Sequence, residues 1–131
     1  MKKIVALSLV LLVTGQAADS SFDTFWQAFK TAVSKRDVET IARLSKFPIG
    51  MSYGIPSVRT KAQLTKRYKQ VFNEQTDAAA CFAKAKPEAD ADNPKRFSVA
   101  CPDAGGNEVV IYHFEKTRPG WKFTGLDNIN E

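Results

Sequence analysis

The chain has 131 residues, two cysteines, one histidine and a formal net charge of +5 at pH 7. This length fits a single domain, and no linker or internal repeat divides the sequence. Two cysteines and one histidine are too few ligands for a typical metal site, so we expect neither a metal nor a cofactor.

The first 17 residues have the features of a secretory signal peptide. Two lysines precede an apolar run over residues 4–13, and the small residues Gly15 and Ala17 follow it. The run is much shorter than the stretch of about 20 residues that a spanning helix needs, so we expect no retained membrane anchor. We predict cleavage after Ala17 and a periplasmic or secreted domain over residues 18–131.

The predicted export also bears on charge and on cysteine chemistry. Residues 1–17 contain two lysines and no acids, so cleavage would lower the net charge from +5 to +3. That charge is ordinary for a soluble domain, and a nucleic-acid partner is not expected for an exported protein. In an oxidising compartment Cys81 and Cys101 are typical of a disulfide, although two buried free thiols would fit the same sequence.

The first half of the predicted domain is helical in pattern. Between residues 22 and 33 the apolar positions recur every three or four residues, which is typical of one buried helix face. A second helix is predicted to begin after Asp37 and to stop before Pro48, because the residue before a proline is disfavoured in helical geometry. A short extended passage follows, and Thr60 with Gln63 forms a capping-box pattern that predicts a third helix.

From residue 79 the pattern changes to alternation, which indicates strands. Small residues alternate over 81–85, and apolar residues alternate over 97–101. We predict an antiparallel hairpin in which Cys81 lies opposite Cys101, so that small side chains face large ones. A disulfide that closes a loop of about 20 residues should contribute on the order of 3 kcal/mol.

Residues 109–129 predict a second hairpin, closed by a turn at Pro119-Gly120. We predict that Phe114 lies opposite Phe123. The same register brings Tyr112 opposite Gly125, although a slip of one residue would change these partners. His113 then points to the face opposite the core. The predicted core face holds five side chains: Val110, Tyr112, Phe114, Trp121 and Phe123.

Helices followed by strands predict an α+β domain. The stretches FWQAFKTAV, RDVETIARLSKFPI, LTKRYKQVF and GWKFTGLDNI resemble small exported members of the NTF2-like superfamily. The resemblance covers nearly all of residues 18–131. It implies an NTF2-like cone (a cystatin-like roll), in which three N-terminal helices pack on a strongly curved antiparallel sheet. It also implies a pocket at the open end of the cone and frequent homodimers through the sheet.

The resemblance leaves the function open, because this superfamily contains enzymes, transport factors, immunity proteins and binders. We expect a non-catalytic domain that binds a partner protein or a small apolar ligand. An immunity or inhibitor protein of the cell envelope is an alternative. Trp26 would line the ligand pocket, with hydroxyls from Tyr53, Tyr68 and Tyr112, although an inward-facing tryptophan is equally typical of a packed core.

A pocket isomerase or hydro-lyase is the enzymatic alternative, with Asp127 or His113 as its acid or base. A histidine titrates near neutral pH, and burial would raise the pKa of an aspartate into a useful range. Both residues also have simpler interpretations. His113 is predicted on the outer face of a strand, and Asp127 belongs to an Asp-Asn pair that ends one. No stretch matches an enzyme motif of the superfamily residue by residue.

Overall fold

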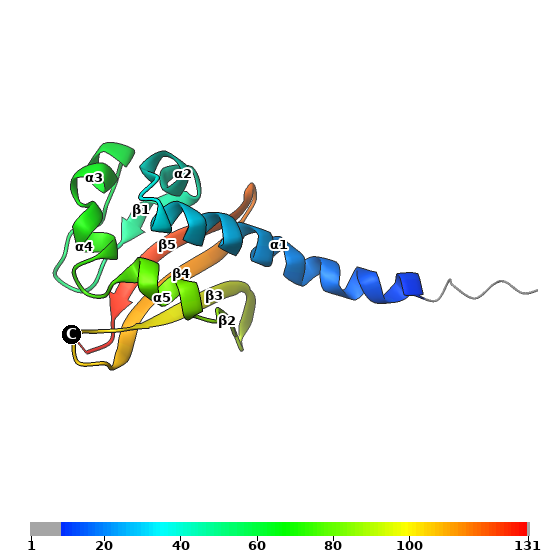
Figure 1. Cartoon of the computed structure of the whole chain (residues 1–131). Helices are drawn as coiled ribbons and strands as arrows, with labels where there is room; N and C mark the ends of the chain where they lie inside the picture. Colours follow the sequence, from blue (N-terminus) through cyan, green and yellow to red (C-terminus); the bar gives the residue numbers. More distant parts are fainter. Residues whose placement is uncertain (1–8, 131) are drawn as a thin grey trace, which may run out of the picture.

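A computed structural model describes residues 9–130, with side chains over residues 21–130. Helix α1 (Leu9–Ser34) passes without a break through Ala17, and its N-terminal part projects beyond the sheet (Figure 1). The start of the predicted signal peptide, residues 1–8, lies outside the described residues, so cleavage after Ala17 stays a prediction. None of the described helices is both long and apolar enough to cross a membrane.

The described chain alternates short helices with a five-stranded sheet. After α1 the helices are α2 (Val38–Arg43), α3 (Lys61–Lys66), α4 (Tyr68–Phe72) and α5 (Ala78–Lys84). The strands are β1 (Ser45–Gly50), β2 (Glu88–Asp90), β3 (Asn93–Pro102), β4 (Glu108–Thr117) and β5 (Gly120–Asn128). They lie in the order β1-β5-β4-β3-β2, and α1 lies across one face of the sheet (Figure 1).

The predicted α+β class is confirmed, with one difference in the sheet. Strands β3, β4 and β5 are antiparallel neighbours, as expected, and a short strand that was not predicted, β2, pairs antiparallel with β3. Strand β1 pairs with β5 in parallel, so the sheet is mixed. Strand β1 follows α2 directly and runs along β5 in the same direction, which makes this edge of the sheet parallel. Pro48 lies in β1, at the edge of the sheet, where a proline is tolerated.

The helix caps explain where the short helices begin. Asp37 accepts a hydrogen bond from the backbone N–H of Thr40 (3.2 Å), and Thr60 accepts one from Gln63 (3.1 Å). The predicted third helix is divided into α3 and α4 at Arg67. The Arg67 guanidinium donates to the carbonyl oxygens of Pro56 and Ser57, so this side chain secures the preceding extended passage.

Residues 78–84 form a helix, so the predicted hairpin between Cys81 and Cys101 is wrong. Asp77 caps α5 by accepting from the backbone N–H of Ala80, and the alanine-rich sequence that follows favours a helix. The predicted disulfide between Cys81 and Cys101 is present in the structure. It joins helix α5 to strand β3, and it therefore connects the helical layer to the sheet.

The last hairpin has the predicted register near its turn and a different one further away. Phe114 lies opposite Phe123, as expected. A β-bulge between His113 and Phe114 then shifts the register, so Tyr112 pairs with Leu126 and not with Gly125. The alternation of buried and exposed residues along β4 is preserved, and all five predicted core side chains are buried.

Candidate functional site

Aromatic rings fill the interior between the helices and the sheet. The ring of Phe114 lies at the centre, with its centroid 5.3–6.0 Å from the centroids of five other rings. These neighbours come from α1 and β5: Phe22, Phe25, Trp26, Phe29 and Phe123. Further rings from α4 and α5 extend the cluster at Phe72 and Phe82. Neither of the two cavities described below is lined by Trp26.

The structure does not bring the four predicted pocket residues together around one space. Trp26, Tyr68 and Tyr112 are buried in the core, whereas 89% of Tyr53 is exposed. The Tyr68 hydroxyl donates to the carbonyl oxygen of Val33 (3.2 Å), and the Tyr112 hydroxyl donates to that of Val71 (2.6 Å). Burial raises the pKa of both tyrosines, so both remain neutral donors within the packed interior.

His113 and Asp127 do come together, on the face of the sheet opposite the helices. The His113 Nε2 and Asp127 Oδ2 atoms are 3.9 Å apart, and about half of each side chain is exposed. Loss of solvation lowers the pKa of His113, and Arg96 lowers it further, although Asp127 and Glu115 oppose the shift. The imidazole is therefore mainly neutral at pH 7, and its contact with Asp127 is not an ion pair at that pH. A shallow cavity of about 360 Å³ lies beside His113, over strands β3 to β5.

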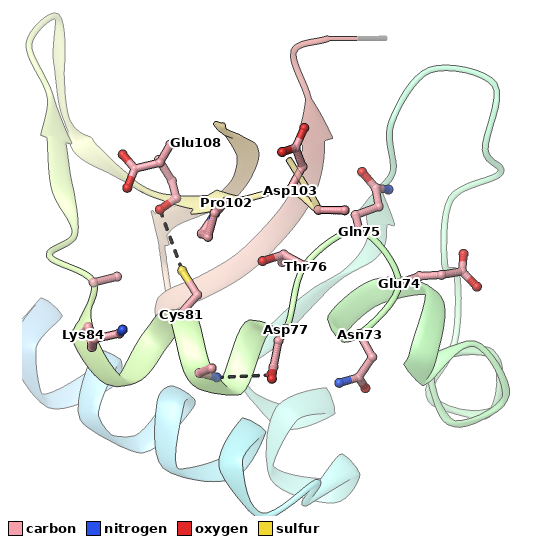
Figure 2. Close-up of a pocket in the computed structure, with 14 residues that line it drawn as sticks. Asn73, Glu74, Gln75, Thr76, Asp77, Cys81, Lys84, Pro102, Asp103 and Glu108 are labelled. Carbon is pink, nitrogen blue, oxygen red and sulfur yellow. Dashed lines mark hydrogen bonds between the residues drawn. The ribbon is translucent and has the colours of Figure 1, made fainter. Parts of the chain in front are cut away.

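The larger cavity, about 590 Å³, lies where helix α5 meets the end of β3, and we call it the α5 cavity (Figure 2). One wall is the α4–α5 connection with α5 itself. The opposite wall is the end of β3 and the β3–β4 loop. The lining residues are Asn73, Glu74, Gln75, Thr76, Asp77, Ala80, Cys81, Lys84, Ala85, Ala100, Pro102, Asp103, Ala104 and Glu108.

The lining of the α5 cavity is rich in carboxylates. Two of them have structural roles: Asp77 caps α5, and Asp103 Oδ1 accepts from the backbone N–H groups of Gly105 and Asn107. The other two, Glu74 and Glu108, are exposed. Over residues 21–130, no hydrogen bond or ion pair engages either of these glutamate side chains.

Thr76 provides a buried polar group at the same cavity. Only 7% of this residue is exposed, yet no described residue forms a hydrogen bond with its hydroxyl. Figure 2 shows the Thr76 oxygen directed toward the side of the cavity formed by Cys81 and Pro102. The oxygen itself is not sealed from solvent, because among the described residues Ser52 Oγ is the one fully buried side-chain oxygen or nitrogen without a hydrogen-bond partner. The Thr76 hydroxyl is therefore open to the cavity, where a ligand group could bond with it. The sequence analysis did not identify Thr76. The only signal was its place in the polar run NEQTD between two helices.

The side chains of the α5 cavity define what a ligand there could contact. Its lining includes no histidine, and Cys81 is held in the disulfide with Cys101. Among the described residues there is no free cysteine and no group of three or more side chains arranged to hold a metal. The side chains available to a ligand are therefore carboxylates, the amides of Asn73 and Gln75, one hydroxyl, one lysine and an apolar wall.

No protein-family model and no curated protein sequence matches the chain. Its structure, however, is similar to several solved ones. One is an NTF2-like protein with a cystatin-like fold from Novosphingobium aromaticivorans, which is 12% identical with a TM-score of 0.50. That comparison covers 96% of this chain and 90% of the other. Another is a hexachlorocyclohexane dehydrochlorinase, LinA-type3, from Novosphingobium barchaimii, which is 10% identical with a TM-score of 0.50. That comparison covers 88% of this chain and 87% of the other.

These similarities define the class of fold: the chain is an α+β domain of the NTF2-like, cystatin-like type. The predicted resemblance is confirmed at this level. Identities of 10–12% do not carry an activity from one protein to another, and the same fold serves many functions. The function of this chain must therefore be argued from its own side chains.

Proposed function

We propose that this protein is an exported, non-catalytic NTF2-like domain that binds a small ligand in the α5 cavity. The observation that carries the proposal is Thr76, a residue only 7% exposed, whose hydroxyl is directed into the cavity and has no hydrogen-bond partner among the described residues. The cavity volume of about 590 Å³ lies within the range of small-molecule sites. Because the lining is charged, the ligand is polar and not the apolar molecule expected from the sequence.

The close packing of the interior also supports a ligand site in the α5 cavity. A ligand beside Trp26 would have to displace rings that already contact one another, such as Phe82 at 5.0 Å and Phe114 at 5.7 Å between centroids. Displacement of tightly packed side chains is costly. The α5 cavity needs no such rearrangement, because its lining residues already leave the space open.

Native mass spectrometry of the protein isolated from its own host tests the proposal. We expect a retained small molecule in the wild type. Ala80→Phe places a bulky ring in the cavity lining and should remove the extra mass. Ala83→Phe is the matched control, because Ala83 is exposed on the same helix but does not line the cavity. Equal retention in both variants would contradict binding in the α5 cavity.

A second candidate function is an isomerase or hydro-lyase centred on His113. The observation that favours it is the 3.9 Å approach of Asp127 beside a largely neutral imidazole, which could act as a general base. Exposure of half of each side chain disfavours it, because such catalysis benefits from a site closed to water. Hydrogen exchange at activated C–H bonds, followed by NMR over a panel of small ketones, would detect this activity. His113→Gln should abolish any such exchange.

A further inference from the structure

We infer that the ligand of the α5 cavity is an organic cation: one or more ammonium groups on an aliphatic stem, as in a diamine or polyamine. This inference rests on the proposed binding function and adds the chemical class of the ligand. Three properties of the lining support it: its charge, its unpaired acceptors and its apolar wall.

The charge of the lining is opposite to the charge of the chain. Four carboxylates and one lysine line the cavity, so the lining carries a formal charge of −3. The whole chain carries +5, which leaves +8 on the remaining residues. A concave site of one sign attracts ligands of the other sign, and the surrounding positive charge disfavours binding of cations elsewhere. The four carboxylates are those of Glu74, Asp77, Asp103 and Glu108.

The acceptors that remain available suit an ammonium group. Asp77 and Asp103 each accept backbone N–H groups through Oδ1, whereas no described residue bonds to the side chains of Glu74 and Glu108. The Thr76 hydroxyl can accept one N–H of an ammonium, which would give this oxygen the partner that the described residues do not provide. An ammonium has three donors and no acceptor, and it can bond to several oxygens at once.

The rest of the lining suits methylene groups. Ala80, Ala85, Ala100, Pro102 and the sulfur of Cys81 form apolar surface between the polar groups. Lys84 is the one cation of the lining, and a cationic ligand must bind despite it. An aliphatic stem between ammonium groups would contact this apolar surface while its charged ends reach the carboxylates.

Isothermal titration calorimetry with three linear probes tests the inference: spermidine as the cation, 1,6-hexanediol as the neutral molecule and adipate as the anion. We expect spermidine to bind, more weakly at high ionic strength, and the other two probes to show no comparable binding. The double variant Glu74→Gln/Glu108→Gln should lower the affinity by about tenfold or more. Both glutamates are exposed, so this variant should fold normally.

Further variants distinguish a specific binding site from non-specific electrostatic attraction of a cation. Thr76→Val keeps the shape of the side chain and should weaken spermidine binding several-fold, with recovery in Thr76→Ser. Lys84→Gln should strengthen binding. Glu88→Gln is the matched control, because Glu88 is an exposed carboxylate outside the lining and its loss should have no effect. Equal effects of the Glu74, Glu108 and Glu88 substitutions would overturn the inference.

The experiments keep the two proposals distinguishable. If hexanediol or adipate binds and spermidine does not, the cation inference fails while binding in the cavity stands. If no probe binds, the cation inference also fails, and the retained-mass experiment with Ala80→Phe and Ala83→Phe decides the proposed function independently. A retained mass that is identified as an amine and is lost in Ala80→Phe would support both.

Discussion

The aromatic interior and the α5 cavity are built from neighbouring parts of the same helices and strands, yet they differ in every property that matters for binding. In the interior the hydroxyls of Tyr68 and Tyr112 are bonded to backbone carbonyls, and rings fill the space between them. At the cavity the Thr76 hydroxyl has no hydrogen-bond partner among the described residues. This difference is the basis of the proposal that the interior serves stability and the cavity serves recognition.

Substitutions in the two regions are therefore expected to affect different quantities, stability in one and binding in the other. Interior changes should lower the free energy of unfolding and alter binding only through loss of the fold. Changes at exposed positions of the cavity should alter binding and leave stability nearly unchanged. Substitutions in each region can test this difference, and the largest expected effect is on stability.

Phe114→Ala should have the largest effect on stability. Phe114 is fully buried at the centre of the aromatic interior, and loss of its ring would leave a cavity bordered by five other rings. We expect the free energy of unfolding to fall by about 3–5 kcal/mol, measured by urea denaturation. Tyr53→Ala is the control: Tyr53 is almost fully exposed, and the change should be within about 0.5 kcal/mol. Similar small losses in both variants would show that the interior is not tightly packed.

Removal of the disulfide should have the next largest effect. Cys81 and Cys101 are 20 residues apart, and a cross-link of that span contributes about 3 kcal/mol by restricting the unfolded chain. We expect the double variant Cys81→Ala/Cys101→Ala to lose about that amount in chemical denaturation. Because Cys81 also lines the α5 cavity, this variant tests whether the two regions are coupled. Unchanged stability, or no difference between oxidised and reduced wild type, would contradict the expectation.

The sequence predicted the regions whose structure depends on local patterns. The inward face of α1 follows from the spacing of its aromatic residues, and the pairing of Cys81 with Cys101 follows from the number of cysteines in a chain predicted to be exported. The prediction for residues 78–84 was wrong because it relied on the alternation of small residues, although alanine favours a helix over a strand. The Asp77 cap decides in favour of the helix. The β-bulge opposite Phe114 places its extra residue, Thr124, on β5. The alternation of buried residues continues along β4 but breaks on β5, where Gly125 and Leu126 are both buried.

The candidate site was harder to predict than the fold. Trp26, Tyr68 and Tyr112 have the residue types of a pocket, but whether rings leave a space depends on how side chains from distant elements pack. Thr76 is one residue in a polar connection, and nothing in that local sequence predicts that it is buried. Only the three-dimensional arrangement shows that its hydroxyl lacks a partner among the described residues.

Tyr112→Phe should have a smaller effect on stability than either change above. The Tyr112 hydroxyl donates a 2.6 Å hydrogen bond to the carbonyl oxygen of Val71, and both groups lie in the interior. Loss of the hydroxyl keeps the ring packing but leaves a buried carbonyl without this donor, at a cost of about 1–3 kcal/mol. Thermal or urea denaturation measures the loss, with Tyr53→Phe as the exposed control. A loss in Tyr112→Phe no larger than in the control would show that the bond contributes nothing to stability.

The smallest expected effect concerns the outer face of the sheet, which belongs to neither region. His113 is the only histidine of the chain, so its imidazole proton resonances can be followed without ambiguity in an NMR pH titration. We expect a pKa below the ordinary value of 6.5, because loss of solvation disfavours the charged ring. The unfolded chain then binds the proton more readily. The contribution of His113 to stability is full above pH 6.5 and decreases as the pH falls toward the lower folded pKa.

Asp127→Asn sharpens this last prediction because it removes the nearest charge that opposes the shift. The pKa of His113 should fall further in this variant, whereas Arg96→Gln should raise it. If Asp127→Asn instead leaves the pKa unchanged, the two side chains are separated by solvent and do not act as a pair. The enzymatic candidate would then lose the one observation that favours it. A downward shift would show that the pair interacts in solution, and its activity would remain to be decided by the exchange experiment with His113→Gln.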